Sequence, residues 1–342
     1  MRLITKFAAG IAVLGVAGCA DFEEDFSKFA QPLTAAQVQE QESGASSATV
    51  VAEDPAPEAA SQQVAATAAP SFGDASGTPS LISTGPGTIK QTFRSGATYE
   101  GGYSNGKRNG TGSYKAPDGF SYTGNWVDDR IEGEGIATYA DGSVYAGAFK
   151  NASPNGFGKI SYADGRTYEG AWINGALTGD GIATYGDGRT YKGGFKNARH
   201  HGQGTATWPD GASYTGNWVD GKQSGTGSAA YADGSIYEGG FVDGKRQGQG
   251  TLKMTDGFVY AGAWADGEIT GQGKATYGNG DVYEGTFVNG NREGDGKAAY
   301  SNGGSYEGGF KAGQRHGEGT YTGPDGFTYT GGWQNGQITG RG

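Results

Sequence analysis

The side chains best suited to chemistry in this chain are cysteine and histidine, and both are scarce. Among 342 residues there is one cysteine, Cys19, so no disulfide can form within the chain, but an exported thiol can be acylated. The three histidines are His200, His201 and His316. No cysteine accompanies them in the sequence, and we expect solvated turn histidines rather than ligands of a metal ion. The sequence therefore predicts no metal, no cofactor and no enzymatic activity.

Two glycine patterns have the outward form of ligand-binding motifs. Asp-Gly pairs such as Asp141-Gly142 and Asp233-Gly234 recur and could form a calcium ladder. Calcium β-rolls use a much shorter repeat with more glycines, whereas a tight turn already accounts for each Asp-Gly pair. The Gly110-x-Gly112 pattern lacks the following helix that a phosphate loop requires. Both patterns are interpreted as structural.

A repeat of 23 residues organises the chain from Tyr99 onward. Tyrosine occupies its first position in eleven consecutive units, glycine holds positions 3, 12 and 14, and position 5 is always aromatic. The rings at positions 1 and 5 are the predicted structural core. In the units with tryptophan at position 5 they are Tyr122 and Trp126, Tyr168 and Trp172, Tyr214 and Trp218, Tyr260 and Trp264, and Tyr329 and Trp333.

Each unit is expected to form one β-hairpin. Positions 1, 3 and 5 alternate with small or polar residues, which predicts a strand with one apolar face. Asn-Gly or Asp-Gly at positions 7 and 8, as in Asn105-Gly106, begins the hairpin loop, and a second strand runs from about position 13 to position 18. Asp-Gly at positions 20 and 21 turns the chain into the next unit. Glycine at position 3 leaves room for a neighbouring ring to lie across the backbone.

These columns resemble the MORN repeat, in which tyrosine, glycine and an aromatic residue alternate before a glycine-rich second half. The resemblance covers residues 99–342, about eleven units with the last one truncated. It implies an all-β fold: a single elongated, twisted and curled antiparallel sheet of consecutive β-hairpins, with the aromatic face inside. Residues 85–98 look like the second half of a unit and are expected to form an N-terminal cap strand.

Position 10 alternates between basic and apolar side chains. The basic ones, which would form a ligand-facing row on the loop edge, are Arg108, His200, Arg246, Arg292 and Arg315. Other units carry an apolar residue at this position, and these are Ile131, Leu177, Ile269 and Ile338, with Gln223 an exception. Position 5 alternates with it between tryptophan and phenylalanine or tyrosine. Two interpretations stay open: growth of the array by duplication of a pair of units, or an edge that reads a ligand.

The first nineteen residues have the features of an export signal. Arg2 and Lys6 give a positive start, and Val16-Ala17-Gly18-Cys19 ends an apolar run with small residues and a thiol. This ending resembles the lipobox of a bacterial lipoprotein signal, although leucine is commoner where Val16 stands. The resemblance implies cleavage of residues 1–18 and acylation of Cys19. The alternative is a secretory signal with an incidental cysteine.

Residues 19–84 differ in composition from the segments on either side. They are rich in Ala, Ser, Gln, Glu and Pro, and residues 19–98 hold 10 acidic and 3 basic side chains. Such a segment cannot bury enough apolar surface to offset its ordering entropy, so we expect a disordered tether. Ala20 follows the cysteine, and by resemblance to the sorting of Gram-negative lipoproteins it favours the outer membrane, with the protein facing the periplasm.

These features predict a membrane-anchored scaffold of the bacterial cell envelope whose repeat rod binds a protein partner. Two alternatives stay open, in which the repeats bind phospholipid or bind glycan such as peptidoglycan. The repeats carry 21 Lys plus Arg and 26 Asp plus Glu, a net charge of −5, which disfavours anionic lipid and nucleic acid. The strand expected at residues 329–333 would be a free edge, which predicts a homodimer through the C-terminal repeat or else a frayed, solvated end.

Overall fold

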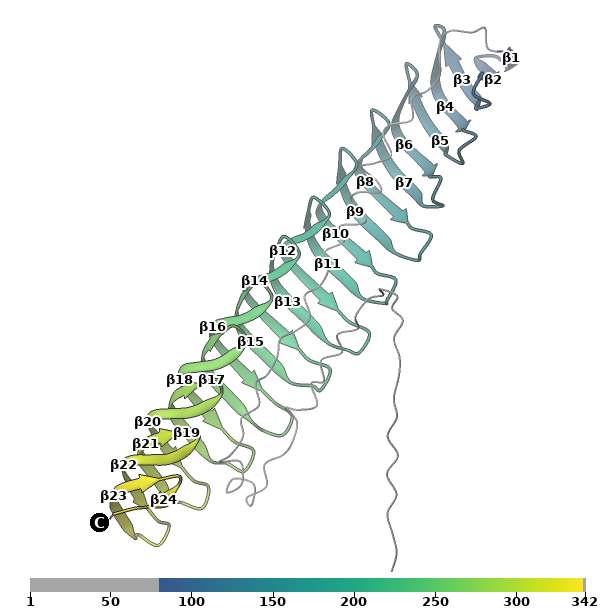
Figure 1. Ribbon diagram of the computed structural model, residues 1–342. Coiled ribbons are helices and arrows are strands. Elements are labelled where there is room, and N and C mark those ends of the chain that lie inside the picture. The colour runs from purple at the N-terminus through teal and green to yellow at the C-terminus, as the bar shows by residue number, and fades with distance from the viewer. Residues whose placement is uncertain (1–79, 341–342) are drawn as a thin grey trace, which may run out of the picture. The chain divides into compact units, whose positions relative to one another are not determined.

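The computed structural model describes residues 80–340, and all of its strands belong to one antiparallel sheet. Each strand pairs with the strands directly before and after it in the chain, so the sheet is a series of consecutive hairpins (Figure 1). No α-helix occurs in this range, and hence none that could cross a membrane. The predicted all-β sheet is confirmed, whereas the signal peptide, Cys19 and nearly all of the tether lie outside the described residues.

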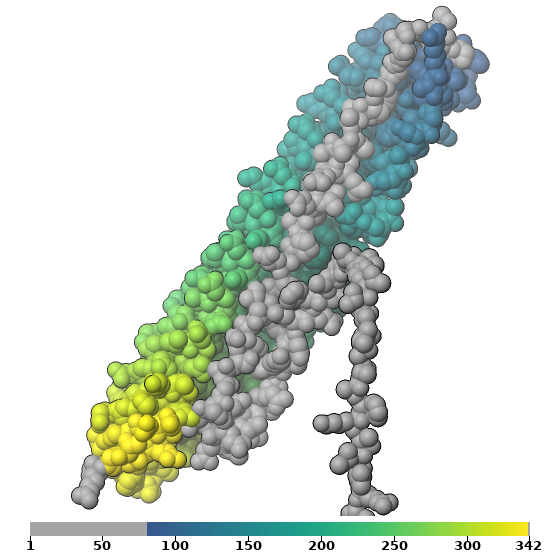
Figure 2. Space-filling model, viewed as in Figure 1, coloured from purple at the N-terminus to yellow at the C-terminus, as the bar shows by residue number. Residues whose placement is uncertain are grey.

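The strands follow the 23-residue period, with a shorter first strand and a longer second strand in each complete unit. Figure 2 shows that the units follow one another along the described surface in sequence order. The strands are β1 Ser80–Gly85, β2 Thr88–Thr92, β3 Thr98–Ser104, β4 Lys107–Lys115, β5 Ser121–Val127, β6 Arg130–Thr138, β7 Val144–Lys150, β8 Ser153–Ser161, β9 Thr167–Ile173, β10 Ala176–Thr184, β11 Thr190–Lys196, β12 Arg199–Thr207, β13 Ser213–Val219, β14 Lys222–Ala230, β15 Ile236–Val242, β16 Lys245–Lys253, β17 Val259–Ala265, β18 Glu268–Thr276, β19 Val282–Val288, β20 Asn291–Ala299, β21 Ser305–Lys311, β22 Gln314–Thr322, β23 Thr328–Gln334 and β24 Gln337–Ile338.

Positions 7 and 8 form a two-residue turn between the strands of each unit. Both residues have positive φ, as in Asn174 at 49° and Gly175 at 80°, which is the signature of a type I′ hairpin turn. Where another residue replaces the second glycine, as at Ala198, φ stays positive at 61°. The second strand therefore begins at position 9 and not at position 13. The longer loop predicted from the sequence is wrong because the glycines at positions 12 and 14 lie within the strand.

The Asp-Gly pair at positions 20 and 21 closes the turn between units. The Ser143 backbone N–H donates a hydrogen bond of 2.8 Å to Oδ1 of Asp141, and Gly142 between them has a φ of 84°. Asp233 accepts the equivalent bond from Ser235, also at 2.8 Å. These carboxylates cap their own turns, which supports the interpretation of the Asp-Gly pairs as turns.

A bulge bends each hairpin. In one unit Gly216 pairs with Gly227, whereas Trp218 pairs with Gln223, so Asn217 alone lies opposite the segment 224–226. An unequal number of residues between paired positions increases the local bend of a strand. The bend turns one face of the sheet inward and makes the two aromatic columns face each other.

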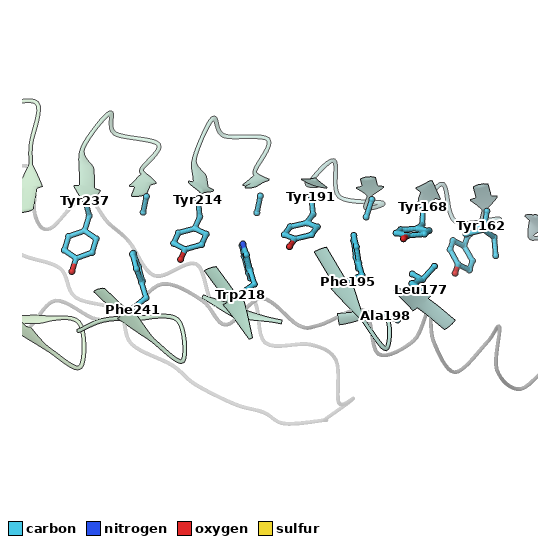
Figure 3. Packing of buried hydrophobic residues seen from close by; sticks show 14 of the residues in the cluster. Tyr162, Tyr168, Leu177, Tyr191, Phe195, Ala198, Tyr214, Trp218, Tyr237 and Phe241 are labelled. Atoms are coloured by element: carbon cyan, nitrogen blue, oxygen red, sulfur yellow. The ribbon is translucent and has the colours of Figure 1, made fainter. Parts of the chain in front are cut away.

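The rings at positions 1 and 5 fill the inside of this bend (Figure 3). Trp218 meets Tyr214 of its own unit edge to face at 5.1 Å between centroids, and Tyr191 of the preceding unit at 5.4 Å. Its indole Nε1–H also donates a hydrogen bond of 3.1 Å to the Gly204 carbonyl of the preceding unit. Rings therefore interlock neighbouring units. The predicted core residues are all buried, namely Tyr122, Trp126, Tyr168, Trp172, Tyr214, Trp218, Tyr260, Trp264, Tyr329 and Trp333.

Each position-1 ring lies across the paired glycines at positions 3 and 14. A Cβ atom on Gly216 would lie 2.6 Å from the Tyr214 hydroxyl oxygen, and one on Gly227 would lie 2.4 Å from it. The same hydroxyl donates a hydrogen bond of 3.1 Å to the Asn217 carbonyl. The prediction that strand glycine makes room for a ring is confirmed, and the ring is that of the same unit.

Both ends of the sheet differ from the prediction. Residues 85–98 do not form a single cap strand, because β1 and β2 make a hairpin that begins at Ser80, inside the predicted tether. At the other end β24 pairs with Trp333 and Gln334, and the Thr339 N–H donates a hydrogen bond of 3.0 Å to the Gly332 carbonyl. The edge expected to be free at residues 329–333 is therefore partly paired, which weakens the argument for a homodimer through it.

Candidate functional site

The basic residues at position 10 lie on strands and not on a loop edge. Arg108 pairs with Tyr103, His200 with Phe195 and Arg315 with Phe310, each next to the turn. Residues paired across antiparallel strands share a face, so these side chains point to the aromatic inner face. Arg108 is only 5% exposed and His200 only 2%. The predicted ligand-facing loop row is wrong for these two residues because the turn is two residues long.

Arg108 is neutralised inside the array. Its Nε–H donates a hydrogen bond of 2.9 Å to Oδ1 of Asp129, and its Nη2 donates one of 3.3 Å to the Asp129 carbonyl. The guanidinium carbon lies 4.6 Å from the centroid of Trp126. Asp129 stands at position 8 of the next unit, where most units have glycine. An ion pair and an aromatic face therefore compensate the burial of this charge.

Arg246, Arg292 and Arg315 repeat this geometry without the carboxylate. Their guanidinium carbons lie 4.3 Å from the Trp264 centroid, 5.3 Å from that of Phe310 and 4.2 Å from that of Trp333, respectively. Each Nη2 donates a hydrogen bond to the position-8 glycine carbonyl of the next unit, and the acceptors are Gly267, Gly313 and Gly336. All three side chains are only partly buried.

His200 is a core residue. Its ring stacks on Tyr191 with centroids 3.6 Å apart and planes inclined by 10°, and its Nε2 is hydrogen-bonded to the Tyr185 hydroxyl at 2.6 Å. Burial lowers the pKa of His200 to about 3, with a further contribution from the charge of Arg189. The expectation of a solvated turn histidine is wrong here. His201 is partly exposed and lies 3.8 Å from a carboxylate oxygen of Asp220.

The alternation at position 5 coincides with that at position 10 because the two positions pair across the strands of each unit. Tryptophan at position 5 is always paired with an uncharged residue at position 10 of its own unit, whereas the other rings are paired with Arg, His or Pro. Both columns change phase together at Phe310 and Arg315, so Arg315 packs against Trp333 of the next unit. The tryptophan pairs are Trp126–Ile131, Trp172–Leu177, Trp218–Gln223, Trp264–Ile269 and Trp333–Ile338.

The outer face carries an apolar cluster that the sequence pattern alone did not bring out. Phe157 on β8 is 66% exposed and pairs with Ala171 on β9, two residues before the 57% exposed Ile173. Ile136 on β6 and Ile182 on β10, with 52% and 49% exposure, lie on either side in the sheet, and the strand register places Lys159 and Glu169 between these two isoleucines. We call these four large side chains the outer apolar cluster. Its signal in the sequence was present, because Phe157 occupies position 13, on the face that should be polar.

No metal-binding cluster accompanies these features in the described part of the chain. Between residues 80 and 340, no three His, Cys, Asp or Glu side chains converge as a metal site requires. The arrangement consists of an inner aromatic face with embedded cations and an outer face with exposed apolar and mixed charged residues.

Comparison with known families decides the nature of the repeat. The model of the MORN repeat matches eleven consecutive segments, which are residues 99–120, 122–144, 145–165, 168–188, 191–213, 214–236, 237–259, 260–282, 283–305, 306–328 and 329–342. The chain belongs to the MORN-repeat family. The resemblance drawn from the tyrosine, glycine and aromatic columns is thus confirmed, and no curated protein sequence matches the MORN array.

Solved structures similar to the chain include the TCP10 domain of Danio rerio CPAP in complex with a peptide of Danio rerio STIL. It is 14% identical, covers 75% of this chain and 100% of its own, and has a TM-score of 0.25. The SAS-4 (dCPAP) TCP domain of Drosophila melanogaster, in complex with a proline-rich motif of Ana2 (dSTIL), is 14% identical, covers 51% and 88%, and has a TM-score of 0.30. These TM-scores carry no argument about the function of the MORN array.

Proposed function

We propose that the MORN array is a protein-binding scaffold, tethered to a membrane of the bacterial cell envelope through Cys19. The observation that carries the binding role is the outer apolar cluster, where Phe157 exposes 66% of its surface. Exposed apolar clusters rimmed by polar residues are typical of protein–protein contacts. A salt bridge of 3.3 Å between Lys159 and Glu169 lies between Ile136 and Ile182 in the strand register and would give a partner polar contacts among the apolar ones.

The inner face weighs against the glycan alternative. Sugar platforms need exposed rings, whereas Tyr122, Tyr145 and Tyr191 have no exposed surface and Trp172 has 1%. The outer face weighs against the phospholipid alternative, because several of its cations are paired across strands. Lys90 lies 3.6 Å from Glu100, and Lys297 lies 2.9 Å from Glu307. Together with the net charge of −5 over the repeats, this leaves little attraction for an anionic membrane.

The binding role is tested by in-cell cross-linking with a matched pair of variants. Phe157→Ser removes the centre of the outer apolar cluster, and Phe327→Ser removes a phenylalanine of similar exposure, 55%, in a turn near the other end of the array. The expected result is that Phe157→Ser loses specific cross-linked protein partners that Phe327→Ser retains. Identical cross-linking patterns for the two variants and the parent chain contradict the proposed surface. Sedimentation with purified peptidoglycan and with anionic vesicles tests the two alternatives in parallel.

The anchor is a second element of the proposal. A Cys19 acylated after removal of residues 1–18 would hold the mature chain in the membrane, and Ala20 behind it favours the outer membrane. Loss of Arg2 and Lys6 with the signal changes the net charge from −10 to −12, so electrostatics would not provide the attachment. Cys19→Ser is expected to block processing and release the chain from membrane fractions. Normal processing and membrane retention of Cys19→Ser would show that Cys19 is not the anchor.

A further inference from the structure

The arginines of the inner face differ in one partner. Arg108 faces the carboxylate of Asp129 at position 8 of the next unit, with Nε 2.9 Å from Oδ1. Arg292 and Arg315 face Gly313 and Gly336 at the same position. Neither of these arginines forms an ion pair within residues 80–340. A carboxylate at position 8 can therefore pair with the arginine at position 10 of the preceding unit, as Asp129 does with Arg108. In the last two units position 8 is glycine, so Arg292 and Arg315 lack this carboxylate.

The guanidinium groups of Arg292 and Arg315 have N–H donors that the surrounding protein does not use. Each donates one hydrogen bond from Nη2 to a backbone carbonyl, although a guanidinium group has five N–H donors in all. Arg315 lies 4.2 Å from the Trp333 centroid and 5.5 Å from that of Tyr321, so its plane is fixed between rings. Both arginine side chains are partly exposed. A fixed planar fork with unused donors suits a carboxylate, because little ordering entropy remains to be lost on binding.

Arg292 and Arg315 lie in neighbouring units, because the alternation of basic and apolar residues at position 10 is broken there. They occupy position 10 of consecutive units, so two strand spacings of ~4.8 Å separate them, roughly 10 Å in all. Tyr300 lies near both: burial raises the pKa of its hydroxyl, and the charges of Arg315 and Arg292 oppose that rise. Arg246 is different, since the neighbouring units carry Gln223 and Ile269 at position 10 and its charge opposes the rise in the Tyr231 pKa that burial causes.

Asp281, a carboxylate whose charge acts on Tyr300, is already engaged. Oδ1 of Asp281 accepts a hydrogen bond of 2.8 Å from the Ser301 N–H, and Oδ2 accepts one of 3.0 Å from the Asn279 side chain. Asp281 therefore stabilises the turns around it and forms no ion pair with Arg292 or Arg315. Between residues 80 and 340 neither arginine has a carboxylate at salt-bridge distance, so both keep a local positive charge in an array whose net charge is negative.

We propose that Arg292 and Arg315 are a two-point carboxylate site for an acidic segment of a protein partner. The inference rests on the proposed protein-binding function and names the chemistry of one partner segment. Carboxylates three residues apart in a peptide of polyproline II conformation lie on the same side and about 9 Å apart, which matches the spacing of the arginines. A peptide fits better than a membrane, because the arginines lie inside the bend of the sheet, where a flat bilayer surface does not enter.

The test places a carboxylate of the chain itself at the site. In the full chain, Gly313→Asp and Gly336→Asp copy the Asp129 arrangement and should occupy Arg292 and Arg315. The backbone accepts this change, because Gly313 has a φ of 81° and a Cβ added to it would meet no atom within 4 Å, and Asp129 adopts 69° at the same position. Gly290→Asp is the matched control, since Gly290 has a φ of 76° and equal space but lies next to Ile269 instead of an arginine.

The probe is a fluorescein-labelled ten-residue peptide with glutamate at every third position, compared with its glutamine counterpart by fluorescence anisotropy. The parent chain should bind the glutamate peptide about tenfold more tightly than the glutamine peptide. The double Asp variant and Arg292→Gln/Arg315→Gln should each lose that preference, while Gly290→Asp keeps it within about twofold. Circular dichroism and thermal unfolding of all variants establish that the fold is retained.

Three outcomes overturn the inference. Equal loss in Gly290→Asp would mean that added charge alone repels the peptide, and an unchanged preference in the double Asp variant would place binding elsewhere. Binding of inorganic phosphate or phosphatidylglycerol vesicles that depends on both arginines, without binding of the glutamate peptide, would assign the site to phosphate groups. The cross-linking experiment on Phe157 is independent, so partner loss there with no peptide binding here would refute the carboxylate site and leave the scaffold role standing.

Discussion

The inner and outer faces of the same sheet obey different constraints. On the inner face Tyr214 contacts Trp218 of its own unit and Phe241 of the next, with centroids 5.1 and 5.0 Å apart, and the same contact pattern recurs along the array. On the outer face the paired positions 2 and 15 hold threonines at 205 and 215, a salt bridge at 159 and 169, and an exposed isoleucine at 182. The inner face repeats because each ring must fit two neighbours, whereas an outer residue needs only water or one partner.

The inner face therefore determines stability, whereas the outer face is free to carry residues for recognition of a partner. Inner positions are fixed by volume, because a ring lies across a glycine pair and any larger residue would overlap it. Outer positions vary at small cost, so they can carry a partner-specific surface such as the outer apolar cluster. Position 10 lies on the inner face yet varies, and it is therefore the place where the fold admits charge. Substitutions on either face test how strict this separation is.

The largest expected effect comes from the inner glycine column. In Gly216→Val, the new Cβ would lie 2.6 Å from both the Tyr214 hydroxyl oxygen and the Gly227 Cα, so the ring must leave its place. We expect a destabilisation of about 2–3 kcal/mol confined to neighbouring units, because units contact only their neighbours. Hydrogen exchange resolved by peptide measures it. Thr215→Val on the exposed outer face is the control, and equal or uniform loosening by the two variants would refute the packing model.

The next effect is a pH dependence at His200. The unfolded histidine takes up a proton near its ordinary pKa of 6.5, whereas burial holds the pKa in the fold at about 3. The unfolded chain thus binds more protons between these values, and stability present above pH 6.5 is lost as the pH falls toward 3, by at most about 1.4 kcal/mol per unit.

The matched variant is His200→Gln, since glutamine occupies this position in the next unit as Gln223. Opening free energies of β12, measured by hydrogen exchange at pH 7 and pH 5, should fall by about 2 kcal/mol more in the parent chain than in the variant. Parallel pH profiles for the two proteins would show that His200 is not a buried neutral residue.

A smaller effect is expected for the pairing of arginine with tryptophan. Trp264 faces the Arg246 guanidinium at 4.3 Å and donates a hydrogen bond of 3.1 Å to the Gly250 carbonyl. Trp264→Phe should cost about 1–2 kcal/mol. In a double-mutant cycle with Arg246→Met the coupling should be about 0.5–1 kcal/mol, above that of Arg292 with Phe310. A coupling no larger than in the phenylalanine pair would favour duplication history as the cause of the alternation.

The fold could be predicted because the inner face is periodic. Tyrosine, glycine and ring columns define strands, faces and the unit, and the structure agrees with all three. The turn at positions 7 and 8 is shorter than the sequence predicts, because the glycines at positions 12 and 14 look like loop residues. In fact Gly227 lies in strand β14 to admit the Tyr214 ring, which is a contact between strands that local patterns do not reveal.

The candidate site could be predicted only in part. The basic residues at position 10 are evident in the sequence. Their direction depends on the length of the turn, so the longer predicted turn placed them on a loop edge, whereas the structure places them on the inner face. The ion pair of Arg108 with Asp129 joins two units, so it can be predicted only when the pairing register of the strands is known. The outer apolar cluster needed only strict attention to alternation, because Phe157 and Ile182 break the polar pattern of their face.

The smallest expected effect on stability belongs to the outer face. Phe157→Ser removes a ring that is 66% exposed and whose paired residue is Ala171, so little buried apolar area is lost. The unfolding free energy should change by no more than about 0.5 kcal/mol, as is usual for exposed positions away from the core. Tyr145→Ser, on the inner face of the same unit and with 0% exposure, is the contrasting substitution and should cost about 3–5 kcal/mol. Hydrogen exchange of β7 and β8 measures both. If Phe157→Ser destabilises these strands as much as Tyr145→Ser does, then the outer ring is part of the core, and the separation of recognition from stability fails in this region.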